Sequence, residues 1–440
     1  MLDVNVKIIA ELKSFIIMIA GNREILNQFC VSDRDFIRKR KLPFEKLALL
    51  IARLCKKTLS VELEKFFEEM GCSMSCSVSA FTQQRIKLEP LFFYFWNKVL
   101  WSSYYLYYGD KVKRWKGYRV IAADGSGVSL INNTALSKYF GGQSNQQTFF
   151  VQAKTFYHYD VLNEMVLLPQ IKPYRYGELN MAYNSIDKIE EDMLTLYDRN
   201  FSSYKMVALH LWQEKERKFV IRAKETQNMI KTFIKSGETS AIVYMPPTTS
   251  AIEGMKKSGF IITKDTLLKI RLVRVELPQS TEVLITNLWE DDGHPAEEFK
   301  DLYFMRWGIE TNISIQKNIL QLESFSGLTV NAVLQDFYAT VMMTNLHSVI
   351  LKDAQQTVED TMKHRKHPMK VNKNKSFGKL KLNLVSLFVN NDTEAVLKKL
   401  HDHFIKEVIP IRKGRSFMRV RKNVQSKNKH RTFTNFKPSY

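Results

Sequence analysis

Two aspartates in this 440-residue sequence stand where catalytic carboxylates are often found. Asp124 follows the apolar segment VIAA, and Asp198 follows the apolar segment TLY. A carboxylate at the end of a strand is held by rigid backbone while its head reaches into a crevice, and catalytic metals are commonly bound in this way. Aspartate is also a common turn and N-cap residue, so either position alone would be weak support for catalysis.

A third candidate is a helical stripe in the segment DLYFMRWGIETNISIQKNIL, made of Tyr303, Arg306, Glu310 and Lys317. At 100° per residue, these four positions fall within roughly a 60° arc of one continuous helix. Glutamate can bind a metal, and arginine and lysine can hold phosphate oxygens, so the stripe suits a surface that handles phosphate. The alternative is a solvated helix face with ordinary intrahelical ion pairs.

The elements that must position these residues form a mixed pattern. Residues 1–110 have helical periodicity, and the segment YRVIAA at 118–123 predicts a buried strand that ends in a turn at Gly125-Ser126-Gly127. Further strands are expected at 148–159, 161–171, 193–197 and 218–223, with helices at 180–192 and 202–214. Residues 224–290 are mostly strand-like, and 296–353 are rich in helix. This order predicts an α/β protein without strict βαβ winding.

A short segment near the N-terminus, SAFTQQRIKL at 79–88, predicts a capped helix with a polar side. We expect its polar residues to be exposed, namely Thr82, Gln83, Gln84, Arg85 and Lys87. Such a helix could be a recognition helix, with Arg85 and Lys87 as DNA contacts. The plainer interpretation is a solvated polar face.

The charge of the chain points to a polyanionic partner. The formal net charge is +21 with a pI near 9.6, which favours nucleic acid. Residues 363–440 carry 21 Lys and Arg against 4 Asp and Glu, so most of the excess lies there. No apolar run is long enough for a membrane span, and four cysteines do not make a disulfide framework. We therefore expect a cytoplasmic protein that does not associate with membranes.

The motifs together resemble a known family. The spacing Y-x2-R-x3-E-x6-K resembles the YREK signature of DDE transposases of bacterial insertion sequences, of the insertion sequence four type. Asp124, and the segment DRNF that begins at Asp198, are similar to the first and second acidic motifs of that family. The motifs occur in the same order, and the resemblance covers about residues 40–350.

The resemblance implies a ribonuclease-H-like catalytic core interrupted by a β-rich insertion, with a helical N-terminal domain and a basic C-terminal region. The implied division is a DNA-binding domain at 1–110, the core at 111–223 and 291–353, the insertion at 224–290 and the basic region at 354–440. It implies Asp124, Asp198 and Glu310 as the catalytic, metal-binding triad. Three carboxylates supply the hard oxygen ligands that Mg²⁺ or Mn²⁺ prefers.

The activity that the resemblance implies is DNA transposition. Two ions about 3.5–4 Å apart would activate water for phosphodiester cleavage at the element ends, and the freed 3′-OH would then be joined to target DNA. Arg306 and Lys317 would hold DNA phosphates near the cut, and Tyr303 would support the same DNA end. The partner is double-stranded DNA, from element ends and target, bound by a homodimer. Two alternatives are an inactive or repurposed DNA-binding protein and a ribonuclease-H-like nuclease.

The basic C-terminal segment supports a first prediction. Residues 411–440 contain 10 Lys and Arg and no acid, so we expect them to bind the DNA backbone without reading sequence. Deleting them should weaken DNA binding generally and reduce the dependence of affinity on salt, measured by fluorescence anisotropy at several salt concentrations. An unchanged salt dependence would count against this role.

Overall fold

The computed structural model describes residues 2–38, 40–144, 149–278 and 280–412. Their contacts divide the chain into two compact units. The first unit, here unit 1, takes the described residues within Met1–Val112, Val128–Ala153 and Ser314–Tyr440. Unit 2 takes Lys113–Gly127 and Lys154–Ile313. The chain therefore passes between the units several times, and each unit combines segments that are distant in sequence.

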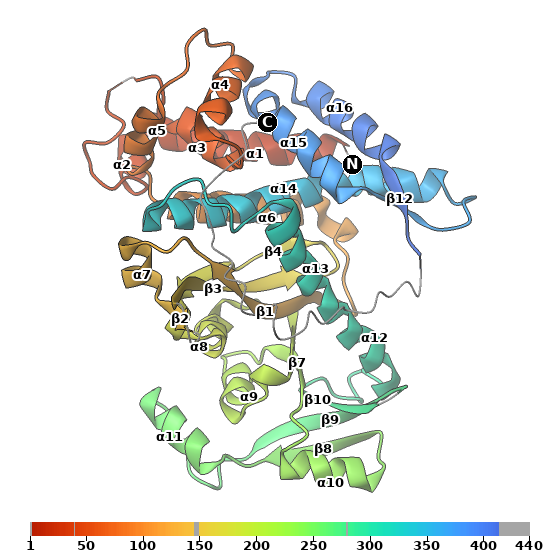
Figure 1. Cartoon of the computed structure of the whole chain (residues 1–440). Coiled ribbons are helices and arrows are strands. Elements are labelled where there is room, and N and C mark those ends of the chain that lie inside the picture. The colour runs from red at the N-terminus through yellow and green to blue at the C-terminus, as the bar shows by residue number, and fades with distance from the viewer. Residues whose placement is uncertain (1, 39, 145–148, 279, 413–440) are drawn as a thin grey trace, which may run out of the picture. The chain divides into compact units, whose positions relative to one another are not determined.

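Unit 1 is built mainly from helices (Figure 1). They are α1 (Leu2–Gly21), α2 (Arg23–Asn27), α3 (Phe44–Ala52), α4 (Leu59–Glu69), α5 (Val78–Arg85), α6 (Leu91–Tyr108), α7 (Thr134–Phe140), α14 (Val330–Thr361), α15 (Lys373–Val389) and α16 (Thr393–Lys406). Helix α14 packs along α6, and α1 packs against both α6 and α16. Short strands β11 (Met369–Val371) and β12 (Val408–Pro410) pair antiparallel, as β2 (Gly142–Ser144) does with the start of β3.

Unit 2 is an α/β unit. Its strands are the first part of β1 (Arg119–Ser129), the second part of β3 (Phe149–Asp160), β4 (Met165–Val166), β5 (Gln170–Pro173), β6 (Met193–Tyr197), β7 (Lys218–Arg222), β8 (Ser240–Met245), β9 (Leu268–Leu277) and β10 (Ser280–Thr286). Its α-helices are α8 (Glu178–Tyr183), α9 (Tyr204–Leu211), α10 (Asn228–Ser236), α11 (Thr249–Lys257), α12 (Phe299–Phe304) and most of α13 (Gly308–Ser314).

The sheet of unit 2 is mixed. Its strand order is β3-β1-β6-β7-β10-β9-β8. The pairs β1–β6 and β6–β7 are parallel, and the pairs β7–β10, β10–β9 and β9–β8 are antiparallel. Every residue of β6 is buried, as are the first five residues of β1, which is the continuous apolar pattern of central parallel strands. Helix α12 covers this core through Phe299 and Leu302, which pack with Val120, Leu196 and Val220. The expected mixed α/β architecture is therefore confirmed.

The register of two parallel strands positions the first two acidic residues. In the pairing of β1 with β6, Ala123 lies opposite Tyr197, and this is the last pair of the ladder. Asp124 and Asp198 are the next residues on the two strands, so both follow the end of the same ladder. Because neighbouring strands are about 4.8 Å apart, this register brings the two backbones close together at this edge.

The predicted turn after Asp124 is wrong. Strand β1 continues through Gly125 and Gly127 to Ser129, because β3 lies beside it and offers backbone partners beyond the point where β6 ends. A side chain of β3 adds a further contact, since the Thr155 hydroxyl donates to the carbonyl of Ser126 at 3.0 Å. The glycines are therefore part of a strand, and Asp124 lies at its middle.

Three other expectations on secondary structure need correction. The strand expected at 161–171 is two short strands, β4 and β5, and the helix expected at 180–192 is α8 followed by a 3-10 turn at Ile186–Lys188. The strand-like region 224–290 contains two helices besides its strands. Gly237 at φ +76° ends α10, and the Thr248 side chain caps α11, so turn-forming residues here delimit helices as well as strands.

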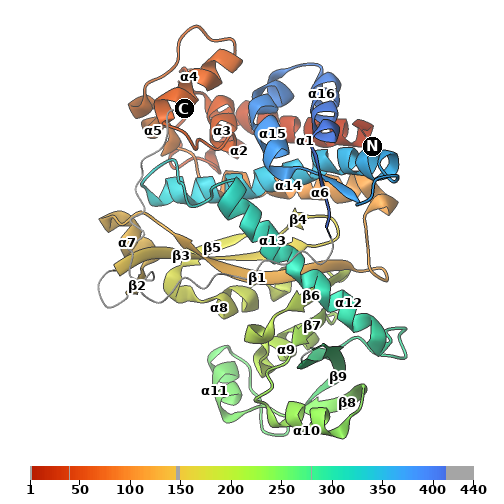
Figure 2. The same ribbon diagram turned by 45° about the vertical axis from the view of Figure 1, so that its right-hand side comes forward.

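The segment around the YREK spacing is helical without a break but is not one uniform α-helix. Helix α12 is followed by a 3-10 turn at Met305–Trp307, then by α13 and a π-helix at Ile315–Ile319. Figure 2 shows α13 following α12. A uniform 100° per residue therefore does not apply across this segment, because 3-10 and π turns rotate the chain by different amounts. The single 60° stripe is an oversimplification.

No helix within the described ranges is long and apolar enough to cross a membrane. The basic region expected at 354–440 is described only as far as residue 412, where it contains α15, α16 and the β11–β12 pair. The remaining residues, 413–440, lie outside the described part of the chain, and so does most of the segment expected to bind the DNA backbone. The five-domain division stays a prediction.

Candidate active site

Asp124 lies in an environment that opposes its negative charge. Its side chain is 19% exposed, and its Oδ1 accepts a hydrogen bond from the backbone N–H of Gly125 at 2.8 Å. The pKa of this carboxyl is raised to about 6, mainly by burial and to a smaller extent by the negative charges of Asp198 and Glu178, against the lowering effects of that hydrogen bond and of Arg306. A carboxyl with these neighbours favours either a proton or a cation.

Asp198 is fixed by its position at the end of β6. Its Oδ1 accepts a hydrogen bond from the backbone N–H of Asn200 at 2.8 Å, which caps the 3-10 turn Arg199–Phe201. The residue before it, Tyr197, is fully buried. The Tyr303 hydroxyl donates to the carbonyl oxygen of Tyr197 at 3.2 Å and so connects α12 to the end of β6. Tyr303 is itself buried, which raises the pKa of its phenol to about 12.

Arg306 connects Asp124 to Glu310. One guanidinium nitrogen, Nη1, is 3.9 Å from Asp124 Oδ2, and Nη2 is 3.2 Å from Glu310 Oε1. The side chain is only 8% exposed and lies over the rings of Tyr303 and Trp307, at 5.7 and 5.1 Å from their centroids. Its Nε is buried and has no hydrogen-bond partner among the described residues. This arginine therefore has a donor left for a further acceptor.

Glu310 is held in place by the packing of Gly308 and Ile309, the two residues before it in α13. Gly308 approaches Val161 so closely that a Cβ at this position would lie 3.3 Å from the Val161 side chain. Ile309 is fully buried, whereas the Glu310 side chain is 41% exposed. The third acidic residue thus lies in the well-anchored first turn of α13 but keeps its carboxylate accessible to solvent.

The structure adds one carboxylate that the sequence analysis missed, Glu178 at the start of α8. A Cβ at Gly125 would lie 2.5 Å from Glu178 Cγ, so this glutamate packs directly against the backbone that follows Asp124. Lys154 forms an ion pair with it at 2.8 Å. The one local signal is the glycine after Asp124, which permits this close approach.

Lys317 belongs to unit 1 and lies on the π-helix. Its Nζ is 4.0 Å from Glu323 Oε1, and 26% of its side chain is exposed. The other three members of the predicted stripe belong to unit 2, with Tyr303 in α12, Arg306 in the 3-10 turn and Glu310 in α13.

The expectation that Arg85 is exposed is wrong. It is 3% exposed and forms an ion pair with Asp336 at 2.6 Å. Its guanidinium also donates to Gln335 Oε1 and Ser326 Oγ, both at 2.6 Å, and to the carbonyl of Ala332 at 3.0 Å. With its donors used in this way, Arg85 holds α5 to the start of α14.

The rest of the predicted recognition helix is divided between buried and exposed positions. Gln84 is also buried, at 7% exposure, whereas Thr82 and Gln83 are exposed. Lys87 is half-buried, and its ammonium donates to Gln84 Oε1 at 3.1 Å. The polar residues of this segment therefore do not form one solvated face.

A divalent cation fits the chemistry of the acidic site. Asp124, Asp198 and Glu310 offer hard carboxylate oxygens, and the pKa of Asp124 is raised mainly by burial and then by the nearby charges of Asp198 and Glu178, which a cation would offset. Within the described ranges, however, no three Asp, Glu, His or Cys side chains lie close enough together to hold a metal ion. Arg306, which contacts two of the three carboxylates, is the counter-charge that the structure records.

Comparison with known proteins assigns the family. Residues 115–346, more than half of the chain, match the family model described as the transposase DDE domain, so the chain belongs to this family. A solved structure that it resembles is the piggyBac transposase synaptic complex with hairpin DNA. The identity is 12% over 97% of this chain and 88% of that chain, with a TM-score of 0.42. No curated protein matches the sequence.

The raised pKa of Asp124 predicts a pH-dependent cost to folding. Since the folded pKa of about 6 lies above that of an unfolded aspartate, the folded chain binds more protons between about pH 4 and 6 and loses stability as the pH rises. In EDTA, Asp124→Asn should remove this cost. It should stabilise the protein by up to about 3 kcal/mol above pH 7 and by almost nothing below pH 4.

Urea unfolding across this pH range would measure the effect, with exposed Asp265→Asn as the matched control. A gain for Asp124→Asn that does not vary with pH would contradict the assigned environment.

The burial of Arg85 predicts a structural role. Replacing it with alanine leaves Asp336 buried without its main partner, so Arg85→Ala should lower the free energy of unfolding by about 3–5 kcal/mol. Lys87→Ala, two residues away, should change it by less than about 1 kcal/mol. Equal changes in the free energy of unfolding for the two substitutions, measured in urea, would show that the contacts of Arg85 do not stabilise the packing of α5 against α14.

Proposed function

We propose that this protein is a DNA transposase that binds terminal inverted repeats, cleaves phosphodiester bonds at the element ends and joins the 3′-OH ends to target DNA. The observation that carries the proposal is the β1–β6 register, which brings Asp124 and Asp198 to the end of one parallel ladder inside the family-matched segment. Glu310 completes the proposed triad, connected to Asp124 through Arg306.

The proposed fold is a ribonuclease-H-like core with an insertion. The three parallel strands β1, β6 and β7 support it, since the proposed catalytic aspartates are the next residues after the last pair of the β1–β6 ladder. The insertion would be the segment 224–290 between β7 and α12, which contains α10, β8, α11, β9 and β10. Residues 1–110 would be the N-terminal DNA-binding domain, and 354–440 the basic C-terminal region.

Asp124, Asp198 and Glu310 would hold two Mg²⁺ or Mn²⁺ ions. When bound, such ions supply an activated water and stabilise the leaving 3′ oxygen of the phosphodiester. No covalent bond between protein and DNA is needed for this chemistry. The carboxylates must be ionised to serve as ligands, and the pKa of Asp124 near 6 is compatible with this at neutral pH.

Arg306 has a second proposed role. Its buried Nε lacks a partner among the residues described, and its guanidinium can hold phosphate oxygens in the bidentate manner. We propose that Arg306 neutralises Asp124 and Glu310 before DNA binds and then contacts a phosphate near the cut. Tyr303 would support the same DNA end indirectly, by fixing the strand end before Asp198. Lys317 is proposed as a further phosphate contact.

The proposed partner is double-stranded DNA, from element ends and target, and the proposed assembly is a homodimer on DNA in the cytoplasm. A second candidate function is DNA binding without cleavage, by an inactive or repurposed transposase. The observation in its favour is that no three metal-ligating side chains gather among the described residues, while Arg306 contacts two of the proposed ligands.

Alanine at each triad position separates cleavage from binding. Asp124→Ala, Asp198→Ala and Glu310→Ala should each abolish Mn²⁺-dependent cleavage of DNA carrying the element ends but leave DNA affinity nearly unchanged, because they remove ligands and no cations. Exposed Glu253→Ala in unit 2 is the control. Cleavage retained in any of the three variants would overturn the triad.

The wild-type protein distinguishes the candidate functions in the same assay. Cleavage followed by joining of the 3′ ends to a second DNA supports the transposase. Specific binding without cleavage supports the inactive form, and cleavage without joining supports a nuclease.

A further inference from the structure

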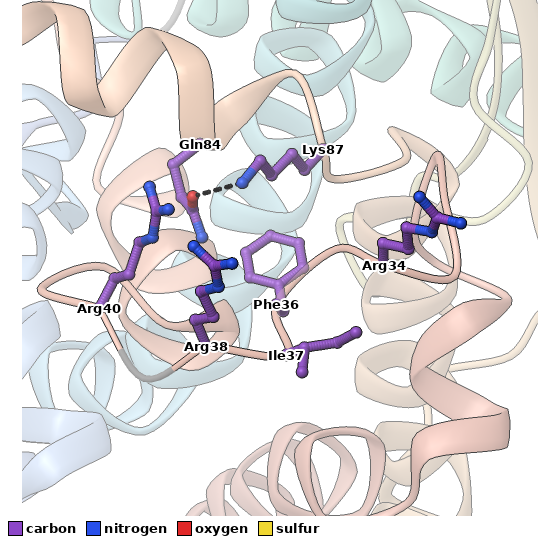
Figure 3. A pocket seen from close by; sticks show the side chains of 7 residues that line it. All are labelled: Arg34, Phe36, Ile37, Arg38, Arg40, Gln84 and Lys87. Atoms are coloured by element: carbon purple, nitrogen blue, oxygen red, sulfur yellow. Dashed lines mark hydrogen bonds between the residues drawn. The ribbon is translucent and has the colours of Figure 1, made fainter.

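A basic cavity lies in unit 1 beside α5, outside the proposed active site. Its volume is about 400 Å³, and the residues that line it are Arg34, Phe36, Ile37, Arg38, Arg40, Gln84 and Lys87 (Figure 3). Four of these seven side chains are cations, and none is an acid. In Figure 3 the charged ends of Arg38, Arg40 and Lys87 gather around Gln84, whereas Arg34 lies across Phe36 from them.

The cations of the basic cavity have no acidic partners among the described residues. Within the described ranges, Arg34, Arg38, Arg40 and Lys87 form no ion pair, unlike the cations elsewhere in unit 1 that pair with Asp or Glu. Asp35, in the same loop, accepts a hydrogen bond from the backbone N–H of Ser32 and does not line the cavity. Like charges that converge in this way repel one another, and an anion between them removes that repulsion.

Three contacts hold part of the basic cavity in place. The buried Gln84 amide donates to the carbonyl of Leu42 at 3.0 Å, and its oxygen accepts from the Lys87 ammonium at 3.1 Å. Phe36 has a φ of +57°, a strained conformation for a bulky residue, and packs edge-on against buried Phe44 at 6.0 Å. The loop that carries the three arginines is therefore anchored at its centre.

The basic surface extends along α5. A second cavity of about 230 Å³ shares Arg40, Gln84 and Lys87 with the first and adds Lys41, again with no acid among its lining residues. Exposed Gln83 and Ala80 of α5 also line it. Cations that continue from one cavity to the next match a chain of phosphates better than a single small anion.

We propose that the basic cavity binds a backbone phosphate of DNA, and that the second cavity receives the neighbouring part of the same strand. Arginine guanidinium groups bind phosphate oxygens in a bidentate manner, and such contacts fix position without reading bases. The proposal rests on DNA being the partner of this protein, but not on cleavage. The DNA contacts expected from the sequence were Arg85 and Lys87. Because Arg85 is buried, the arginines proposed to contact DNA beside Lys87 are instead Arg34, Arg38 and Arg40.

The test is the salt dependence of DNA binding, measured by fluorescence anisotropy in EDTA so that cleavage plays no part. The double variant Arg38→Ala/Arg40→Ala should bind more weakly than wild type. Raising the salt from 50 to 200 mM lowers the DNA affinity of both proteins by some factor. If two phosphate contacts are lost, this factor should be about 12 times smaller for the variant than for wild type. The double variant Arg38→Lys/Arg40→Lys, which keeps the charge, should largely restore this slope.

The matched control is Lys7→Ala/Lys98→Ala, which removes two exposed cations from α1 and α6 away from the cavity. A salt slope equal to wild type in the arginine variant, or an equal loss in the control, would overturn the proposal. Inorganic pyrophosphate is the competing probe. Saturable binding of pyrophosphate that the arginine variant abolishes, with DNA affinity unchanged, would assign the cavity to a free phosphate compound instead.

The two proposals fail in different ways. If wild-type protein binds DNA and the arginine variant loses affinity, but no cleavage occurs, the cavity stands and the transposase activity falls. If cleavage occurs and the arginine variant binds DNA as wild type does, the transposase activity stands and the cavity proposal falls.

Discussion

The parallel pairing of β1 with β6 is the constraint on which the rest of the candidate site depends. Both strands are buried at all of the paired residues, so a slip of one residue would force close-packed side chains on both faces of the sheet to repack. The register is therefore strongly specified, and it brings Asp124 and Asp198 to the same end of the ladder. Two carboxylates in a partly buried place repel each other, and the surrounding residues can be understood as responses to that repulsion.

The main response is Arg306. Its burial against two aromatic rings costs solvation, which its contacts with Asp124 and Glu310 partly offset. The pKa of Asp124 remains raised, because burial and the nearby acids outweigh this one cation. Lys154 plays a similar part for Glu178. Each of these carboxylates, Asp124, Glu310 and Glu178, therefore has a cation from the chain itself beside it.

The positive charge of the chain is used in more than one way. Some cations are internal, such as Arg85, whose guanidinium donates to residues at the start of α14. Others line the basic cavity without acidic partners in the described residues, and many lie in the C-terminal region. A net charge of +21 therefore says that a polyanion is a favourable partner, but not which cations would meet it.

Local sequence patterns were enough to identify the apolar strands before Asp124 and Asp198, the spacing around Glu310 and the mixed α/β class. These features depend on neighbours in the chain, so periodicity and motif spacing reveal them. The burial of Arg85, paired with a residue 251 positions later, was decided by tertiary structure alone. So were the approach of Glu178 to Gly125 and the continuation of β1 beside β3. Burial and charge pairing depend on which distant segments pack together, and no local pattern encodes that choice.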